Sequence, residues 1–82
     1  MNDAIIREKL LKCFSAVFPQ LSPSEIAAAN AENTSGWDSV AHVTLLTLIG
    51  EEFDMDVDFE QFEHAVSFSG FATLIEEIKA NA

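Results

Sequence analysis

Basic residues are scarce in this chain of 82 residues, which has four Lys and Arg against 14 Asp and Glu and a formal net charge of −10. No Lys or Arg lies between Cys13 and Ile78, whereas all the acidic residues except Asp3 and Glu8 lie there. We expect neither nucleic acid nor membrane as a partner, because phosphate backbones and anionic lipid surfaces repel negative charge. Such a charge can simply keep a protein in solution, or it can steer the protein onto partners with basic patches.

Cysteine, glycine and proline are also rare, with one, three and two residues. The single cysteine, Cys13, cannot form an internal disulfide, which is typical of a reducing cytoplasm. Its spacing places it among the core positions of the first predicted helix, so we expect a buried, unreactive thiol. No apolar run approaches the ~20 residues of a transmembrane helix. The N-terminus also lacks the basic and apolar stretches of a secretory signal, and the predicted location is therefore the cytoplasm.

Hydrophobic residues make up 49% of the chain, enough for one modest core, so residues 1–82 are predicted to form a single domain. Apolar residues recur at helical spacing in a first segment, which Asn2 or Asp3 can cap and Pro19 ends. Its expected inward residues are Ile6, Leu10, Cys13, Phe14, Val17 and Phe18. A last helix, capped by Ser67, has the expected inward residues Phe68, Phe71, Leu74, Ile75 and Ile78.

A second long helix is predicted to start at Asp38 or Ser39. Its expected inward residues are Val40, Val43, Leu45, Leu46, Leu48, Ile49 and Phe53. In the long connection before it, the capping box from Ser22 to Glu25 starts a short helical turn. A further short helix is expected over residues 60–65, with Phe59 and Phe62 inward. The fold class is therefore all-α: a small bundle of three longer helices and one short helix, with a long first loop.

One serine stands where the second helix begins, at the end of a polar loop. Gly36 can adopt positive φ and turn the chain, and Asp38 can cap the orphan amides of the helix. Ser39 then lies in the first turn, where a helix tolerates added negative charge. Ser39 is therefore a suitable place to attach a phosphate-linked group.

Asp38-Ser39-Val40, opening an apolar helix in a short acidic chain, resembles the acyl carrier proteins, and the resemblance extends from Ile5 to Ile78. It implies the acyl-carrier fold, with 4′-phosphopantetheine from coenzyme A attached to Ser39 and a thiol that holds acyl groups as thioesters. It implies a carrier rather than an enzyme. The expected partners are a phosphopantetheinyl transferase and acyl-transferring or acyl-modifying enzymes with basic docking patches. A monomer suits a molecule that visits several enzymes.

The chain departs from the carriers of fatty acid synthesis, which usually have Leu after the serine and acidic residues along the exposed face of the second helix. Here Val40 follows Ser39, and Ala41, Thr44 and Gly50 stand where acidic residues are common. The negative charge is shifted towards residues 51–63. A carrier for fatty acid or other lipid biosynthesis and one for a specialised acyl pathway both remain open.

Other candidate residues have less specific readings. His42 lies three residues after Ser39, on the same side of the helix, and either touches the attached group or stacks on Trp37. A catalytic Ser–His pair is not expected, because it would also need an orienting acid and an oxyanion hole. Trp37 either packs against the loop or stays partly exposed and meets a partner. Asp54, Asp56 and Asp58 begin like a calcium loop, but the required Gly and Glu are missing, so no metal site is predicted.

Two alternatives to a carrier remain open. The chain could be a cofactor-free helical adaptor that binds a basic partner through its acidic face, in which case Ser39→Ala would leave its function intact. A small hydrolase that uses Ser39 is the remoter alternative. We predict no catalytic residue and no metal ligand, and Ser39 as the one cofactor-binding residue.

Overall fold

The structure is a computed structural model that describes residues 3–80, with side chains from Ala4. It confirms the all-α fold class, with three longer helices and two short ones in the described part of the chain. The helices are α1 (Asp3–Val17), α2 (Pro23–Ala27), α3 (Ser39–Glu52), α4 (Phe59–Phe62) and α5 (Phe68–Ala80). Asn2, one of the two residues expected to cap α1, lies outside the described residues.

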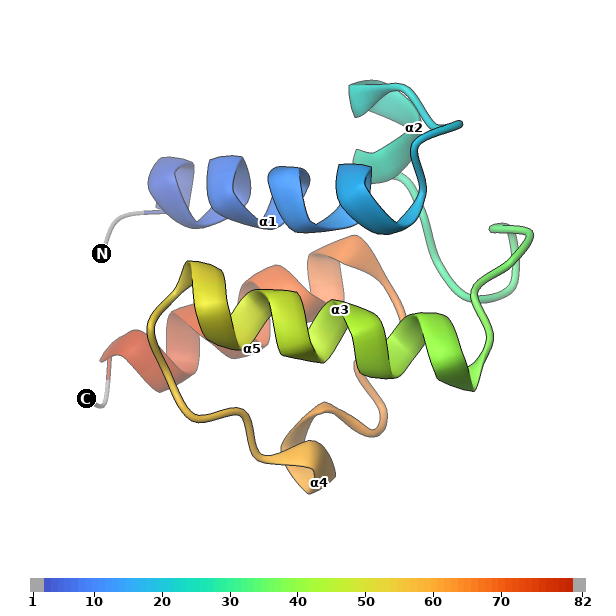
Figure 1. Cartoon of the computed structure of the whole chain (residues 1–82). Coiled ribbons are helices and arrows are strands. Elements are labelled where there is room, and N and C mark those ends of the chain that lie inside the picture. The colour runs from blue at the N-terminus through green and yellow to red at the C-terminus, as the bar shows by residue number, and fades with distance from the viewer. Residues whose placement is uncertain (1–2, 81–82) are drawn as a thin grey trace.

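The helix α1 is the centre of the packing, because it contacts α3, α5 and α2. Figure 1 shows α1 above α3 and α5, with α2 at the far end of α1 and α4 below α3. One isolated bridge, between Asn30 and Ser67, ties the first loop to the start of α5 within residues 3–80. In the same range, no helix is long and apolar enough to cross a membrane.

The core is rich in aromatic rings, with Phe14 of α1 at its centre. The Phe14 ring meets Trp37, Phe68 and Phe71 edge-on, with centroids 5.3 to 5.6 Å apart. Edge-to-face pairs of this kind bring the positive rim of one ring to the negative face of another. Most inward residues expected for α1 and α5 are buried; Val17, Leu74 and Ile78 are half-buried.

The inward face predicted for α3 is correct only over its second half. Leu45, Leu46 and Ile49 are buried, but Val40 and Val43 are 73% and 44% exposed. The error arises because successive residues of the predicted inward face, from Val40 to Ile49, are three positions apart. Three residues fall about 60° short of a full helical turn, so three such steps rotate the position around the helix by about half a turn. Val40 therefore lies on the side of α3 opposite Ile49.

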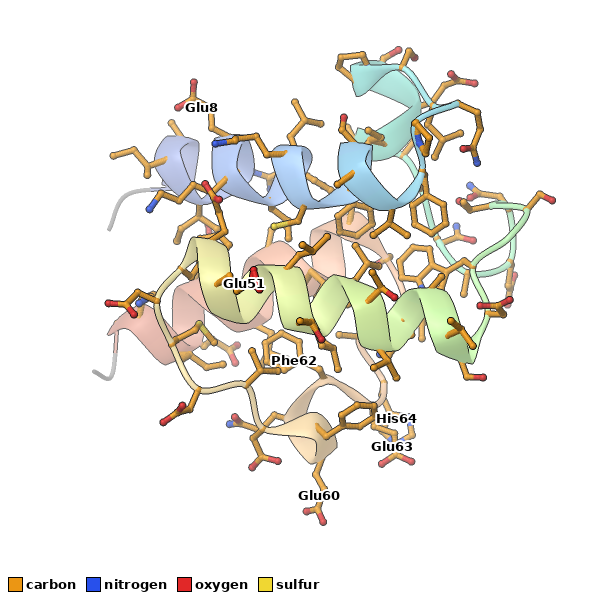
Figure 2. The ribbon with its side chains drawn as sticks, viewed as in Figure 1. Glu8, Glu51, Glu60, Phe62, Glu63 and His64 are labelled. Atoms are coloured by element: carbon orange, nitrogen blue, oxygen red, sulfur yellow. The ribbon has the colours of Figure 1, made fainter. Side chains whose placement is uncertain are left out.

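The short helix α4 is also shorter than expected, and only part of its predicted apolar side is covered. Phe62 is fully buried, whereas Phe59 is 52% exposed. Figure 2 shows Phe62 directed towards α3 and the core, while Glu60 and Glu63 point away from the bundle. A helix of one turn can direct one ring into the core while its first residue stays at the rim.

The predicted capping residues of α2 and α5 are confirmed. The Ser22 amide donates to Glu25 Oε1 over 2.8 Å, and the Glu25 amide donates to Ser22 Oγ over 3.3 Å, so both bonds of the capping box form. The bond from the Ser22 amide, together with the Ser22 side chain, holds the pKa of the Glu25 carboxyl below its ordinary value. Ser67 Oγ accepts from the Gly70 amide over 2.9 Å at the start of α5.

Lysines from the other long helices close the C-terminal end of α3. Lys79 of α5 donates to the Phe53 carbonyl oxygen over 2.9 Å, and Lys9 of α1 donates to that of Glu52 over 3.5 Å. Lys12 forms an ion pair of 3.3 Å with the Glu52 carboxylate. Cations are favourable there, because the last carbonyl groups of a helix carry its negative partial charge.

Candidate functional site

The loop before Ser39 is held by hydrogen bonds of its own. Asn30 and Asn33 bind each other reciprocally: each amide N–H donates to the other side-chain carbonyl oxygen, over 2.8 and 2.9 Å. The Thr34 hydroxyl donates to Asn33 Oδ1, and the Thr34 carbonyl oxygen accepts from the Trp37 amide. Such Asx bonds satisfy backbone groups that would otherwise need a helix or a strand. The polar loop is therefore an ordered support for the residues that follow it.

Trp37 anchors this loop in the core. Its side chain is only 9% exposed, and its ring lies near Phe14, Phe18 and Phe71, with centroids 5.5 to 6.1 Å apart. Trp37 is therefore not partly exposed, and its ring packs against the aromatic core rather than only against the loop. Because Trp37 is buried, Ser39, two residues later, is held at a fixed place on the surface.

The start of α3 has the predicted local geometry. Gly36 has a φ of 89°, which favours glycine, and turns the chain after the loop. Asp38 is the N-cap, and its Oδ1 accepts from the Ala41 amide over 2.9 Å. Ser39 is the first helical residue, and its side chain is exposed. The Ser39 hydroxyl is therefore open to an enzyme in solution.

An open, largely apolar pocket of about 320 Å³ adjoins Ser39. Trp37, Asp38, Ser39, His42 and Val43 line it from the loop and α3, and Ala31, Phe59, Glu63 and Val66 line its other sides. Three of these apolar residues, Val43, Phe59 and Val66, are about half exposed. The pocket can therefore receive an apolar group that is attached close to Ser39.

His42 forms the wall between this pocket and the core. Trp37 Nε1 donates to His42 Nδ1 over 3.3 Å, and His42 Nε2 lies 3.0 Å from the Phe62 carbonyl oxygen. An indole N–H can only donate, so His42 Nδ1 must be the acceptor. Nε2 then carries the ring hydrogen and donates it in a hydrogen bond to the Phe62 carbonyl oxygen. The imidazole also stacks on Trp37, as one reading of the sequence expected. Both ring nitrogens are thus engaged with Trp37 and Phe62 rather than with Ser39.

The remaining candidates lie away from this site. Cys13 is 4% exposed, and burial, together with the Glu52 carboxylate, raises the pKa of its thiol to about 11. His64 is exposed. Among residues 3–80, no three His, Cys, Asp or Glu side chains are arranged so that they could hold a metal ion.

Sequence reasoning identified Ser39, Asp38 and Gly36 but missed the role of His42 as a bridge to α4. The contact joins residues 42 and 62, and no local pattern encodes a pairing over that distance. It also missed the pocket, because Val43 and Phe59 were assigned to the core. Comparisons with protein-family models, curated proteins and solved structures found no match for this chain.

Proposed function

We propose that this protein is an acyl carrier that bears 4′-phosphopantetheine on Ser39. The observation that carries the proposal is the placement of Ser39: exposed at the first residue of α3, behind an ordered loop and beside an apolar pocket. The likeness of Asp38-Ser39-Val40 to the acyl carrier proteins supports the same reading. When bound, the group would supply a thiol that holds an acyl chain as a thioester.

The residues around Ser39 fit a phosphodiester at this position. The first amides of a helix have no intrahelical carbonyl partner and favour negative charge. The helix α3 begins at Ser39 and is 14 residues long. Asp38 already accepts from the Ala41 amide, so a phosphate on the Ser39 oxygen would be held by other amides of the first turn of α3. In the attachment reaction, the Ser39 oxygen displaces the nucleotide half of coenzyme A from phosphorus, and the transferase takes up the serine proton.

The expected partners are enzymes with basic patches, namely a phosphopantetheinyl transferase and enzymes that load or modify the acyl group. The charge of −10 and the lack of Lys and Arg between Cys13 and Ile78 support such partners. We place the protein in the cytoplasm as a monomer that moves between enzymes, in a lipid or a specialised acyl pathway.

Intact-protein mass spectrometry tests the proposal directly. Incubation with coenzyme A and a broadly tolerant phosphopantetheinyl transferase should add the mass of one phosphopantetheinyl group. Ser39→Ala should abolish the addition, whereas Ser35→Ala, which changes an exposed serine of the same loop, should not. An unmodified wild-type protein, or an addition that survives in Ser39→Ala, would refute the carrier.

One observation favours an adaptor without a cofactor as the second candidate: α3 exposes Val40 and Val43 and has no Asp, Glu, Lys or Arg from Ser39 to Gly50. The adaptor requires that Ser39→Ala bind the partner as wild type does and support the same function. The carrier requires that Ser39→Ala keep its fold, as seen by circular dichroism, and lose all function.

A further inference from the structure

The apolar pocket at the start of α3 ends at two rings, those of Trp37 and His42. The ring of Phe71 packs against both from the side of the core, with its centroid 6.1 Å from that of Trp37 and 5.7 Å from that of His42. Phe14 and Phe62 pack against Phe71 in turn, each with a centroid distance of 5.6 Å. These three phenylalanines are fully buried and do not line the pocket. The aromatic core therefore begins where the pocket stops.

His42 is fixed at this boundary, because both nitrogens of its ring are engaged. Nδ1 accepts from Trp37 Nε1 over 3.3 Å, and Nε2 donates to the Phe62 carbonyl oxygen over 3.0 Å. The imidazole also stacks on the Trp37 ring, with an angle of 27° between the two planes. A rotation of the imidazole would leave the indole N–H and the carbonyl oxygen without their partners, which is unfavourable away from water. An entering chain therefore cannot easily push His42 aside.

The rest of the pocket is open and small. Val43, Phe59 and Val66 line it with apolar side chains that are each about half exposed. Its volume of about 320 Å³ is close to the lower limit of the range of about 300–1,000 Å³ that is usual for ligand pockets. The pocket is thus open at its mouth, limited in volume and closed at its inner end.

We propose that His42 is a specificity-determining residue that closes the inner end of the pocket and restricts it to a short acyl group. An apolar chain gains stability from each methylene group that it buries, so it gains only as far as the pocket extends. Trp37 belongs to the core and anchors the loop, and His42 is therefore the residue whose replacement opens the pocket. The closure rests on the geometry alone, whereas the acyl nature of the occupant rests on the proposed carrier function.

Alkyl chains attached at residue 39 test the closure without any cofactor. The variant Ser39→Cys is treated with methyl, butyl or decyl methanethiosulfonate. The introduced thiolate attacks the thio sulfur of the reagent, a disulfide bond forms and methanesulfinate leaves. Cys13 should not react, because it is 4% exposed and burial raises the pKa of its thiol to about 11. Wild type, treated in the same way, is the control for this selectivity.

The butyl chain should raise the Tm above that of the methyl derivative. The decyl chain should raise it by less than about 5 °C beyond butyl, at a protein concentration low enough to prevent association of the chains. A decyl chain in the core would bury about six more methylene groups and exceed this limit clearly. In spectra of the 15N-labelled protein, the indole N–H signal of Trp37 should be the same with butyl and decyl. A larger rise in Tm, or a displaced indole signal with decyl alone, would overturn the proposal.

Two further variants of α3, each combined with Ser39→Cys, make a matched pair. His42→Ala removes the wall, so decyl should now raise the Tm by more than about 5 °C beyond butyl. Val43→Ala widens only the mouth and should leave the two chains equivalent. An equal response of both variants would show that His42 is not the wall. If His42→Ala does not fold, the chains on Ser39→Cys alone decide, because that comparison leaves His42 in place.

The phosphopantetheinylated protein separates this inference from the carrier function. If wild type is modified, and a decanoyl group on the arm raises the Tm by more than about 5 °C beyond butanoyl, the limit on the acyl group is wrong and the carrier stands. If the alkyl disulfides stop at His42 but the transferase never modifies wild type, the closure stands and the carrier is wrong.

Discussion

The indole N–H of Trp37 donates to Nδ1 of His42 over 3.3 Å, which joins the loop before Ser39 to the first turns of α3. The other ring nitrogen of His42 reaches the Phe62 carbonyl oxygen at the end of α4. One imidazole on α3 therefore ties both the preceding loop and the distant α4 to this helix, and all three segments line the pocket beside Ser39.

Replacing His42 by Phe should destabilise the protein by about 1–3 kcal/mol, because the Trp37 N–H and the Phe62 carbonyl oxygen would both lose their partner. The matched control is His64→Phe, at the exposed histidine, which should change stability by less than about 0.5 kcal/mol. Urea unfolding followed by the fluorescence of the single tryptophan measures both. Equal stabilities of the two variants would contradict the bridge.

Gly36→Ala should cost about 1–2 kcal/mol, because Gly36 has a φ of 89° and an L side chain is strained there. An added Cβ would have no atom within 4 Å, so the cost comes from the backbone alone. Gly36→Asn should cost less, since Asn tolerates positive φ better. Thermal unfolding of both variants is the measurement, and a more stable Gly36→Ala would be the contrary result.

Lys79→Met should destabilise the protein more than Lys12→Met. Lys79 donates to the Phe53 carbonyl oxygen at the end of α3 and is half-buried, so its loss should cost about 1–2 kcal/mol. The Lys12–Glu52 ion pair has a lysine side chain that is 72% exposed, and such pairs contribute about 0–1 kcal/mol. Chemical denaturation of the two variants in parallel would show whether this order holds.

Stability should fall at alkaline pH through Cys13. Burial and Glu52 raise the pKa of its thiol from 9.0 to about 11. Between these values the unfolded chain loses the thiol proton while the folded protein keeps it, so the folded state binds more protons and its stability decreases as pH rises.

The check on Cys13 is the free energy of unfolding between about pH 8 and 10.5, in wild type and in Cys13→Ala. The variant starts from a lower stability, because it leaves a small cavity, but should show a shallower decline. Parallel declines would mean that the thiol does not cause the loss.

The sequence by itself determined the three longer helices and the starts of α2, α3 and α5. Local signals were enough there: the Ser22–Glu25 capping box, the Asp38 cap, the Gly36 turn and the Ser67 cap all act within a few residues. These signals also placed Ser39 at the first position of α3. Helical spacing identified the buried residues of α1 and α5 for the same reason.

The tertiary structure alone decided which side of α3 is covered and which residues line the pocket beside Ser39. Spacing could not show that Val40, Val43 and Phe59 are exposed, because exposure depends on which neighbours reach a helix face and how far. Nor could it show the bond from His42 to Phe62, since residues so far apart meet only when α4 folds back against α3. The caps are thus local properties of the chain, whereas the pocket arises only from the packing of whole helices.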